Sequence, residues 1–328
     1  MVDDVARRVV TFTANPSIDR TLTLDGPLLR GQLLRASGVT EQAAGKGVNV
    51  ARVLSAAGLP VTVVAAALDR GFRTLAEHAE PPLTVLGQSL DDGRRVRMNT
   101  TVTEPDGTTT KLNEPGPLLT AAHLEVAADS LVDVARGAAW VALAGSLPPG
   151  APDHWYASLV GRLSGLGCRI AVDTSGPALD ALVASLDAPI DLIKPNAEEL
   201  AQLTGGSPQE FEAAAERGEL DGIVAAARSL QERGIRAVLV TLGGSGAVLV
   251  TGGGAWFARA PRISVRSTVG AGDSSVAGFI LADIRGADPA QCLATSVAYG
   301  SAAAALPGTT LPTPADLTTG QVDVIALG

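Results

Sequence analysis

A glycine-rich segment ending in an acidic residue is the part of this chain best suited to chemistry. It reads Gly270-Ala271-Gly272-Asp273 and leads into an apolar stretch, residues 274–284, that is typical of a buried helix. Glycines let a ligand approach the backbone closely, and the first N–H groups of a helix attract anions. A carboxylate held beside a bound phosphate can take a proton from an attacking hydroxyl. The alternative interpretation is that Asp273 only caps the helix.

A second glycine-rich segment, residues 241–246, follows an apolar run at 237–240. It superficially resembles a dinucleotide-binding fingerprint. That motif must open a helix, however, whereas residues 247–250 are typical of another strand. The segment is either a loop passing close to a nucleotide or a glycine-rich turn.

A lysine between two glycines, Gly45-Lys46-Gly47, precedes a helical stretch at 48–57. It is not a phosphate-binding loop of the Walker type, because that motif places a serine or threonine after the lysine. Together with Asn49, it offers a flexible backbone, a cation and a helix start, which suits binding of a polyol or a phosphate. The alternative is a tight strand-to-helix turn with a solvated lysine.

Polar residues also follow the apolar run at 191–193, in the sequence Lys194-Pro195-Asn196-Ala197-Glu198-Glu199. Ligands of doubly wound sheets lie beyond the carboxyl ends of strands, so this position favours function. Asn196 and Glu199 would share a face of an opening helix, and their oxygens suit Mg²⁺ held through water. The alternative is an Asn cap followed by acidic residues that compensate the helix dipole.

Arg97 and Asn99 stand two apart in an alternating strand, so they project from the same face. Arginine suits bidentate phosphate recognition, although a surface arginine on a strand is also common.

The elements that position these residues are those of an α/β protein. Short apolar runs at 140–144, 169–172, 191–193 and 237–240 predict parallel strands buried on both faces, and most are followed by helical patterns. Alternating strands earlier in the chain contrast with them. No change in composition marks a linker, so we expect one doubly wound domain over residues 1–328. A small β-sheet, with strands inserted at about 20–42 and 94–113, would form a lid.

Composition excludes several classes of protein. The net charge of −9 argues against a general binder of nucleic acid or membrane surfaces, so any anion site must be built locally. Aromatic residues make up only 3%, so aliphatic side chains are expected to grip a nucleotide base. The two cysteines and three histidines lack the spacing of a disulfide framework or a metal site. Without an apolar segment for export or membrane insertion, we expect a cytoplasmic protein.

The order of the motifs resembles one known family, the ribokinase-like carbohydrate kinases, and within it the branch of 1-phosphofructokinases and tagatose-6-phosphate kinases. The resemblance extends from about residue 9 to about residue 310. It is carried by Asn15-Pro16-Ser17-Ile18-Asp19, Gly45-Lys46-Gly47-Val48-Asn49-Val50-Ala51-Arg52, Lys111-Leu112-Asn113-Glu114-Pro115-Gly116-Pro117, Gly145-Ser146-Leu147-Pro148-Pro149-Gly150, the 194–199 motif and the 268–273 motif.

This resemblance implies a ribokinase-like fold, ATP and Mg²⁺ as cofactors, and a role for each motif. It makes Asp273 the general base and the amides of Gly270, Ala271 and Gly272 the anion hole. It makes a monovalent cation a candidate cofactor, and it implies a homodimer formed through the lids. The implied sugar set is Asp19, Gly45, Lys46 and Asn49, with Arg97 and Ser146 towards the substrate phosphate. The implied ATP set is Lys194, Asn196, Glu199, Thr241, Gly243 and Gly246, with Asn196 and Glu199 organising Mg²⁺.

The sugar is the open point. Ala44 stands where the family often has glycine, and residues 65–71 replace a usual glycine-rich stretch. Fructose 1-phosphate is the expected substrate, with the product fructose 1,6-bisphosphate. Tagatose 6-phosphate, fructose 6-phosphate and an unphosphorylated sugar or nucleoside are alternatives. A non-catalytic sugar or nucleotide sensor on the same fold is the alternative from another class, and the intact Gly-Ala-Gly-Asp argues against it.

Overall fold

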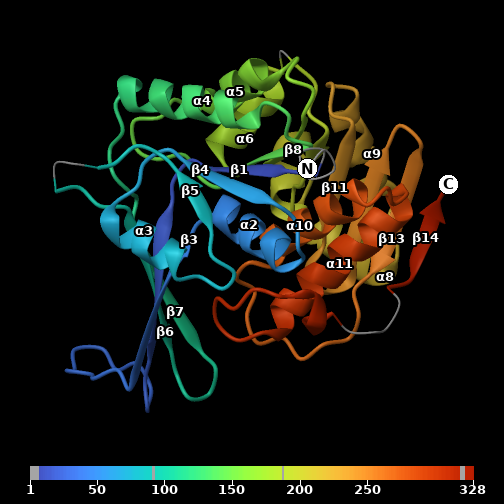
Figure 1. Cartoon of the computed structure of the whole chain (residues 1–328). Coiled ribbons are helices and arrows are strands. Elements are labelled where there is room, and N and C mark those ends of the chain that lie inside the picture. The colour runs from blue at the N-terminus through green and yellow to red at the C-terminus, as the bar shows by residue number, and fades with distance from the viewer. Residues whose placement is uncertain (1–6, 91–92, 187, 318–321) are drawn as a thin grey trace.

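A large central sheet organises the chain, as the computed structural model shows for residues 7–90, 93–186, 188–317 and 322–328 (Figure 1). Seven neighbouring strands run parallel, and three antiparallel strands close one edge. The expectation of a mostly parallel α/β sheet is confirmed. In spatial order the strands are β14 (Val324–Leu327), β13 (Gly254–Arg259), β12 (Gly246–Thr251), β11 (Ala237–Thr241), β10 (Leu192–Ile193), β9 (Arg169–Asp173), β8 (Trp140–Ala144), β1 (Val9–Thr13), β4 (Val61–Ala65) and β5 (Thr84–Leu86).

Helices cover both faces of this sheet and bury its central strands, whereas the edge strands β5 and β14 stay partly exposed. Alternate residues of β8 belong to two different cores, Val141 and Leu143 to one and Trp140 and Ala142 to the other. This is why the strand is continuously apolar rather than alternating. The helices are α2 (Lys46–Ala56), α3 (Arg70–Glu77), α4 (Ala121–Ala135), α5 (Trp155–Leu163), α6 (Pro177–Ala184), α7 (Ala197–Thr204), α8 (Pro208–Arg217), α9 (Asp221–Gln231), α10 (Ala271–Ile284) and α11 (Pro289–Ala305).

A separate four-stranded sheet projects from the body, and Figure 1 shows it at the lower left. We call it the lid. Its spatial order is β3 (Gly38–Ala44), β2 (Ser17–Thr23), β6 (Arg97–Thr103) and β7 (Thr109–Asn113). The strands come from two excursions of the chain, one between β1 and α2 and the other between β5 and α4. Both excursions leave the central sheet at the carboxyl ends of its strands, so the lid lies beside the edge where ligands of such sheets bind.

Membrane insertion has no helical candidate in the described part of the chain. None of its helices combines the length and the apolar character that a bilayer-spanning segment requires.

Candidate active site

A cavity of about 730 Å³ opens between the lid and the carboxyl edge of the central sheet. Its walls come from β2, β6 and β7 of the lid, from the starts of α2, α7 and α10, and from the loops after β11 and β13. Fifteen of the sixteen residues predicted for the site line it: Asp19, Gly45, Lys46, Asn49, Arg97, Lys194, Asn196, Glu199, Thr241, Gly243, Gly246, Gly270, Ala271, Gly272 and Asp273.

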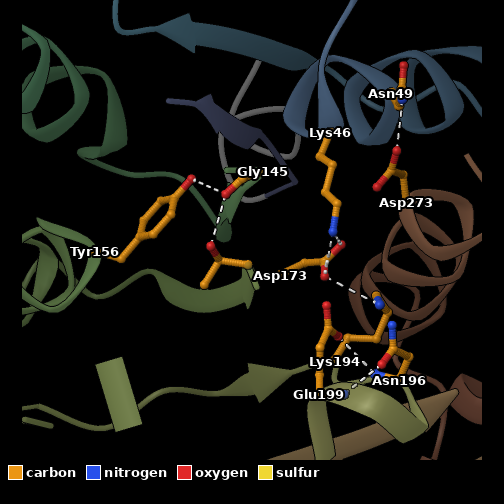
Figure 2. Close-up of polar contacts among 10 residues, drawn as sticks. Lys46, Asn49, Gly145, Tyr156, Asp173, Lys194, Asn196, Glu199 and Asp273 are labelled. Atoms are coloured by element: carbon orange, nitrogen blue, oxygen red, sulfur yellow. Dashed lines mark hydrogen bonds and ion pairs between the residues drawn. The ribbon is translucent and has the colours of Figure 1, made fainter. Parts of the chain in front are cut away.

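Asp273 lies in the first turn of α10, not at its cap. The helix begins at Ala271, three residues earlier than the sequence predicted, and Gly270 occupies the capping position. The interpretation of Asp273 as a cap is therefore wrong, since its Oδ2 instead accepts a hydrogen bond of 2.8 Å from Nδ2 of Asn49 (Figure 2). Burial raises the pKa of the Asp273 carboxyl to about 6, against the opposing charge of Lys46. A carboxylate with that pKa is suited to proton transfer near neutral pH.

The backbone before Asp273 is shaped for an anion. Gly270 has φ of 76°, in the left-handed region that glycine adopts readily. A Cβ on Gly272 would stand 3.3 Å from Nζ of Lys194, so the lysine lies directly against this turn. The first N–H groups of α10 have no partner within the helix and border the cavity. Together with Lys194 they can stabilise negative charge there.

A buried carboxylate that the sequence analysis missed joins two of the cations. Asp173 lies between Lys46 and Lys194, as Figure 2 shows, with each Nζ 3.3 Å from its carboxylate. Asp173 and Lys194 are both buried. Burial alone would raise the pKa of Asp173, but the charges of Lys194 and Lys46 outweigh it and lower that pKa. The same pairing raises the pKa of Lys46.

A signal for Asp173 was present in the sequence. Asp173 is the last residue of β9, at the carboxyl edge of a doubly wound sheet, where ligand sites gather. It stands in no glycine-rich motif, and only the pairing of β9 with β10 brings it to Lys194.

The lid supplies the polar floor of the cavity. Oδ1 of Asp19 accepts hydrogen bonds from Ser17 Oγ at 2.8 Å and from Asn99 Nδ2 at 3.0 Å. Arg97 lies on the same face of β6 as Asn99, as the alternation predicted, and its Nε donates to the carbonyl of Asn15. Burial raises the pKa of Asp19, although these hydrogen bonds and Arg97 oppose the change. The adjacent strand adds Lys111, which the sequence analysis did not single out for the site.

Asn196 and Glu199 form a reciprocal cap at the start of α7. Oδ1 of Asn196 accepts from the Glu199 amide at 2.8 Å, and Oε2 of Glu199 accepts from the Asn196 amide at 2.9 Å. The capping alternative is thus realised, and yet both residues line the cavity. Glu199 is buried and uses one carboxylate oxygen in the cap. Its second oxygen suits a hydrated Mg²⁺, so the donor set fits that ion.

The opposite end of the cavity is aliphatic. Thr241, Gly243 and Gly246 line it, and β12 follows them, so the strand predicted in place of a Rossmann helix is confirmed. Leu242, Pro261, Ile263 and Val265 lie nearby in the lining. None of the described residues around the cavity is aromatic, so a base would be held by aliphatic contacts.

Ser146 is the one predicted residue that the structure does not bring into the cavity. It is exposed and absent from the described lining. The preceding Gly145 has φ of 102°, and its carbonyl accepts a hydrogen bond from Tyr156 Oη at 2.9 Å (Figure 2). The same carbonyl accepts from Thr174 Oγ1 at 3.0 Å. These contacts fix the turn on the body of the protein, and the role of Ser146 towards the substrate phosphate stays a prediction.

Known proteins share this sequence over most of its length. The chain matches the pfkB family carbohydrate kinases over residues 12–316. It is 36% identical over 310 residues to the 1-phosphofructokinase of Rhodobacter capsulatus, covering 94% of this chain and 93% of that protein. It is 35% identical over 319 residues to the 1-phosphofructokinase of Haloferax volcanii, covering 96% and 97%.

Solved structures show the same fold. Phosphofructokinase-2 from Escherichia coli in complex with substrates and products superposes with a TM-score of 0.83 at 28% identity, covering 94% of this chain and 97% of that one. Ribokinase from Arabidopsis thaliana, complexed with ribose and ATP, gives 0.70 at 22% identity, covering 95% and 97%, which supports the ribokinase-like fold alone. The family match over most of the chain identifies the activity class as phosphotransfer to a carbohydrate. This chain belongs to the pfkB family of carbohydrate kinases.

Proposed function

We propose that this chain is an ATP-dependent 1-phosphofructokinase, which converts fructose 1-phosphate to fructose 1,6-bisphosphate. The observation that carries the proposal is the placement of Asp273, a buried carboxylate of raised pKa at an anion-binding helix start, between a polar lid and a glycine-lined aliphatic end. The names of the relatives at 35–36% identity favour this sugar.

The proposed reaction needs a base and stabilisation of the transferring phosphoryl group. Asp273 takes the proton of the sugar hydroxyl while the oxygen of that hydroxyl bonds to the γ-phosphorus of ATP. The bond from that phosphorus to the β–γ bridging oxygen breaks, and ADP leaves. The amides of Gly270, Ala271 and Gly272, with Lys194, stabilise the charge of the group in transfer.

Mg²⁺ would be held through water by Asn196 and Glu199, and it supplies charge neutralisation at the ATP phosphates. A crystal structure of Phosphofructokinase-2 from Escherichia coli contains potassium, which makes a monovalent cation a further candidate cofactor here.

The cations around the lid favour a sugar that already carries a phosphate. Arg97 and Lys46 line the cavity beside Asp19, Gly45 and Asn49, in a protein of net charge −9. A neutral sugar would not require Arg97, whereas Lys46 is also the partner of Asp173. Phosphofructokinase-2 from Escherichia coli was solved with fructose 6-phosphate, so that sugar remains the second candidate, alongside tagatose 6-phosphate.

Release of ADP across a panel of sugars tests the proposal. We expect the highest kcat/KM with fructose 1-phosphate, and lower values with fructose 6-phosphate, tagatose 6-phosphate and fructose. Each assay is run with MgATP, with and without potassium ions. A preference for another ketose phosphate would replace the sugar and keep the kinase, whereas ATP binding without turnover of any sugar would favour a sensor.

We also propose a homodimer through the lids. Val39 and Leu112 are 57% and 62% exposed and lie on the lid face opposite Lys111 and Asn113, and Leu33 on the segment between β2 and β3 is 80% exposed. Exposed aliphatic surface of this kind is typical of an interface. A related protein from Escherichia coli has a tetrameric inhibited form, so association occurs among similar chains.

Light scattering tests the lid interface. We expect a dimer for the wild type and a monomer for Val39→Lys/Leu112→Lys, because two buried lysines would cost more than the interface gains. Val126→Lys is the matched control, since Val126 is a 51% exposed residue of α4 outside the lid, and it should remain a dimer. A monomeric wild type, or a dimeric double variant, would contradict the proposal.

A further inference from the structure

The side-chain amide of Asn99 has a fixed orientation. Asn99 lies on β6 between Asp19 on β2 and Asn113 on β7, directly opposite both. Its contact with Asp19 is 3.0 Å, and an ionised carboxylate accepts hydrogen bonds but cannot donate them. The NH₂ group must therefore face Asp19, and the amide oxygen must face elsewhere.

That amide oxygen has no hydrogen-bond partner. Oδ1 of Asn99 is buried, and nothing in the described part of the chain donates to it. Buried polar atoms in folded proteins are almost always paired, and the unpaired ones call for an explanation. Asn99 lines the cavity, so a bound ligand is the natural source of the missing donor.

Asp19 offers a second acceptor at the same place. Both hydrogen bonds it receives, from Ser17 and from Asn99, go to Oδ1. Its other oxygen, Oδ2, has no donor among the described residues. Asp19 Oδ2 and Asn99 Oδ1 therefore lie on the two sides of a single hydrogen bond, and both are free to accept from a ligand. A pair of neighbouring hydroxyl groups supplies two donors from one ligand, whereas a phosphate or a deoxygenated carbon does not.

We propose that Asn99 is a specificity-determining residue that accepts a hydrogen bond from one hydroxyl of the sugar, while the Asp19 it orients accepts from the adjacent hydroxyl. This inference rests on the proposed function, because it assigns the sugar end of the cavity to a ketose phosphate. Among the non-anomeric hydroxyls on the furanose ring of fructose 1-phosphate, the adjacent pair is that on C3 and C4.

The test removes one hydroxyl of the sugar at a time and compares the effect in the wild type with the effect in a variant that lacks the Asn99 amide. The kcat/KM of wild type and Asn99→Ala is measured with fructose 1-phosphate and with its 3-deoxy and 4-deoxy analogues. For the wild type we expect a loss of about tenfold or more with at least one analogue, because a buried acceptor is left unpaired. In Asn99→Ala the discrimination against the analogue that lacks the hydroxyl bound by Asn99 should shrink to within about threefold, since its acceptor is already gone, whereas discrimination against the other analogue, whose missing hydroxyl donates to Asp19, should remain. The KM for ATP should stay near the wild-type value in both.

Thr100→Ala is the matched control, because Thr100 is the next residue of β6 and points to the other face of the lid. It should retain the wild-type discrimination. Equal discrimination by wild type and Asn99→Ala, with intact wild-type turnover, would overturn the role of Asn99 alone. If no ketose phosphate is turned over, calorimetric titration with the same three sugars repeats the comparison as Kd ratios, so the kinase proposal fails while Asn99 is still tested. Absence of binding by all three overturns both.

Discussion

Asp273→Asn is expected to lower kcat by about 10²-fold or more, because it removes the group that accepts the proton. Asparagine has the same shape, and its Oδ1 can still accept the hydrogen bond from Asn49 Nδ2. The affinity for ATP should therefore stay near the wild-type value. Initial rates of ADP release at saturating substrates, with ATP affinity from equilibrium titration, measure the two effects separately.

The pH dependence checks the same assignment. A base acts only when ionised, so the kcat/KM of the wild type should rise with pH through about 6, the pKa of Asp273, and then level off. The stability effect has the opposite sign. The pKa of Asp273 is higher in the folded protein than in the unfolded chain. The stabilising contribution of its protonated form is therefore present at low pH and is lost as the pH rises from about 4 to about 6. The variant should therefore unfold at no lower temperature than the wild type at pH 7. Wild-type turnover in the variant would remove Asp273 as the base.

Asp173→Asn is expected to have the largest effect on stability. It removes the buried negative charge shared by Lys46 and Lys194, and breaking a buried ion pair from one side costs about 3–5 kcal/mol. We expect a loss of this order in the free energy of unfolding from urea denaturation at pH 7. The folded pKa of Asp173 is lowered, so its contribution is present above the unfolded pKa of about 4 and is lost as pH falls through the folded value. The gap between wild type and variant should narrow in acid.

Two further variants show whether the loss of stability comes from the buried charge of Asp173 or from the loss of any aspartate carboxylate. Asp129→Asn breaks a surface ion pair with Arg162 and should cost less than about 1 kcal/mol. Asp173→Asn/Lys194→Met removes one uncompensated lysine, and it should recover part of the stability while activity stays low. Unchanged stability in Asp173→Asn, or no recovery in the double variant, would contradict the three-residue network.

The main elements of the fold were predictable because their patterns are local. The continuous apolar run of β8 predicted a strand buried on both faces. The apolar residues 247–250 predicted that a strand, β12, and not a Rossmann helix follows the glycine-rich segment. The start of α10 was placed three residues late, because Ala271 and Gly272 carry no helical pattern. Alternation predicted lid strands close to β2, β6 and β7, whereas β3 was covered only by the predicted insertion at about 20–42.

Site residues could be predicted where a sequence motif stands at the carboxyl end of a strand. They could not be predicted where contacts between distant segments determine which side chains meet. Ser146 was taken from a motif as a whole, and it does not line the described cavity, because its position depends on the turn that Gly145 makes with Tyr156 and Thr174. Asp173 was missed because its partners come from α2 and from the end of the adjacent strand. The unpaired oxygen of Asn99 depends on which atoms face Asp19, which no sequence pattern encodes.

Identification of the product by ³¹P NMR is the most direct test of the account. Wild type and Asp273→Asn are incubated separately with MgATP and fructose 1-phosphate. We predict that the wild type forms ADP and a second phosphate ester at C6 in equal amounts, and that the variant forms both at about 1% of that rate or less. Formation of ADP without the sugar bisphosphate, or equal rates for both proteins, would contradict phosphoryl transfer to the sugar with Asp273 as its base.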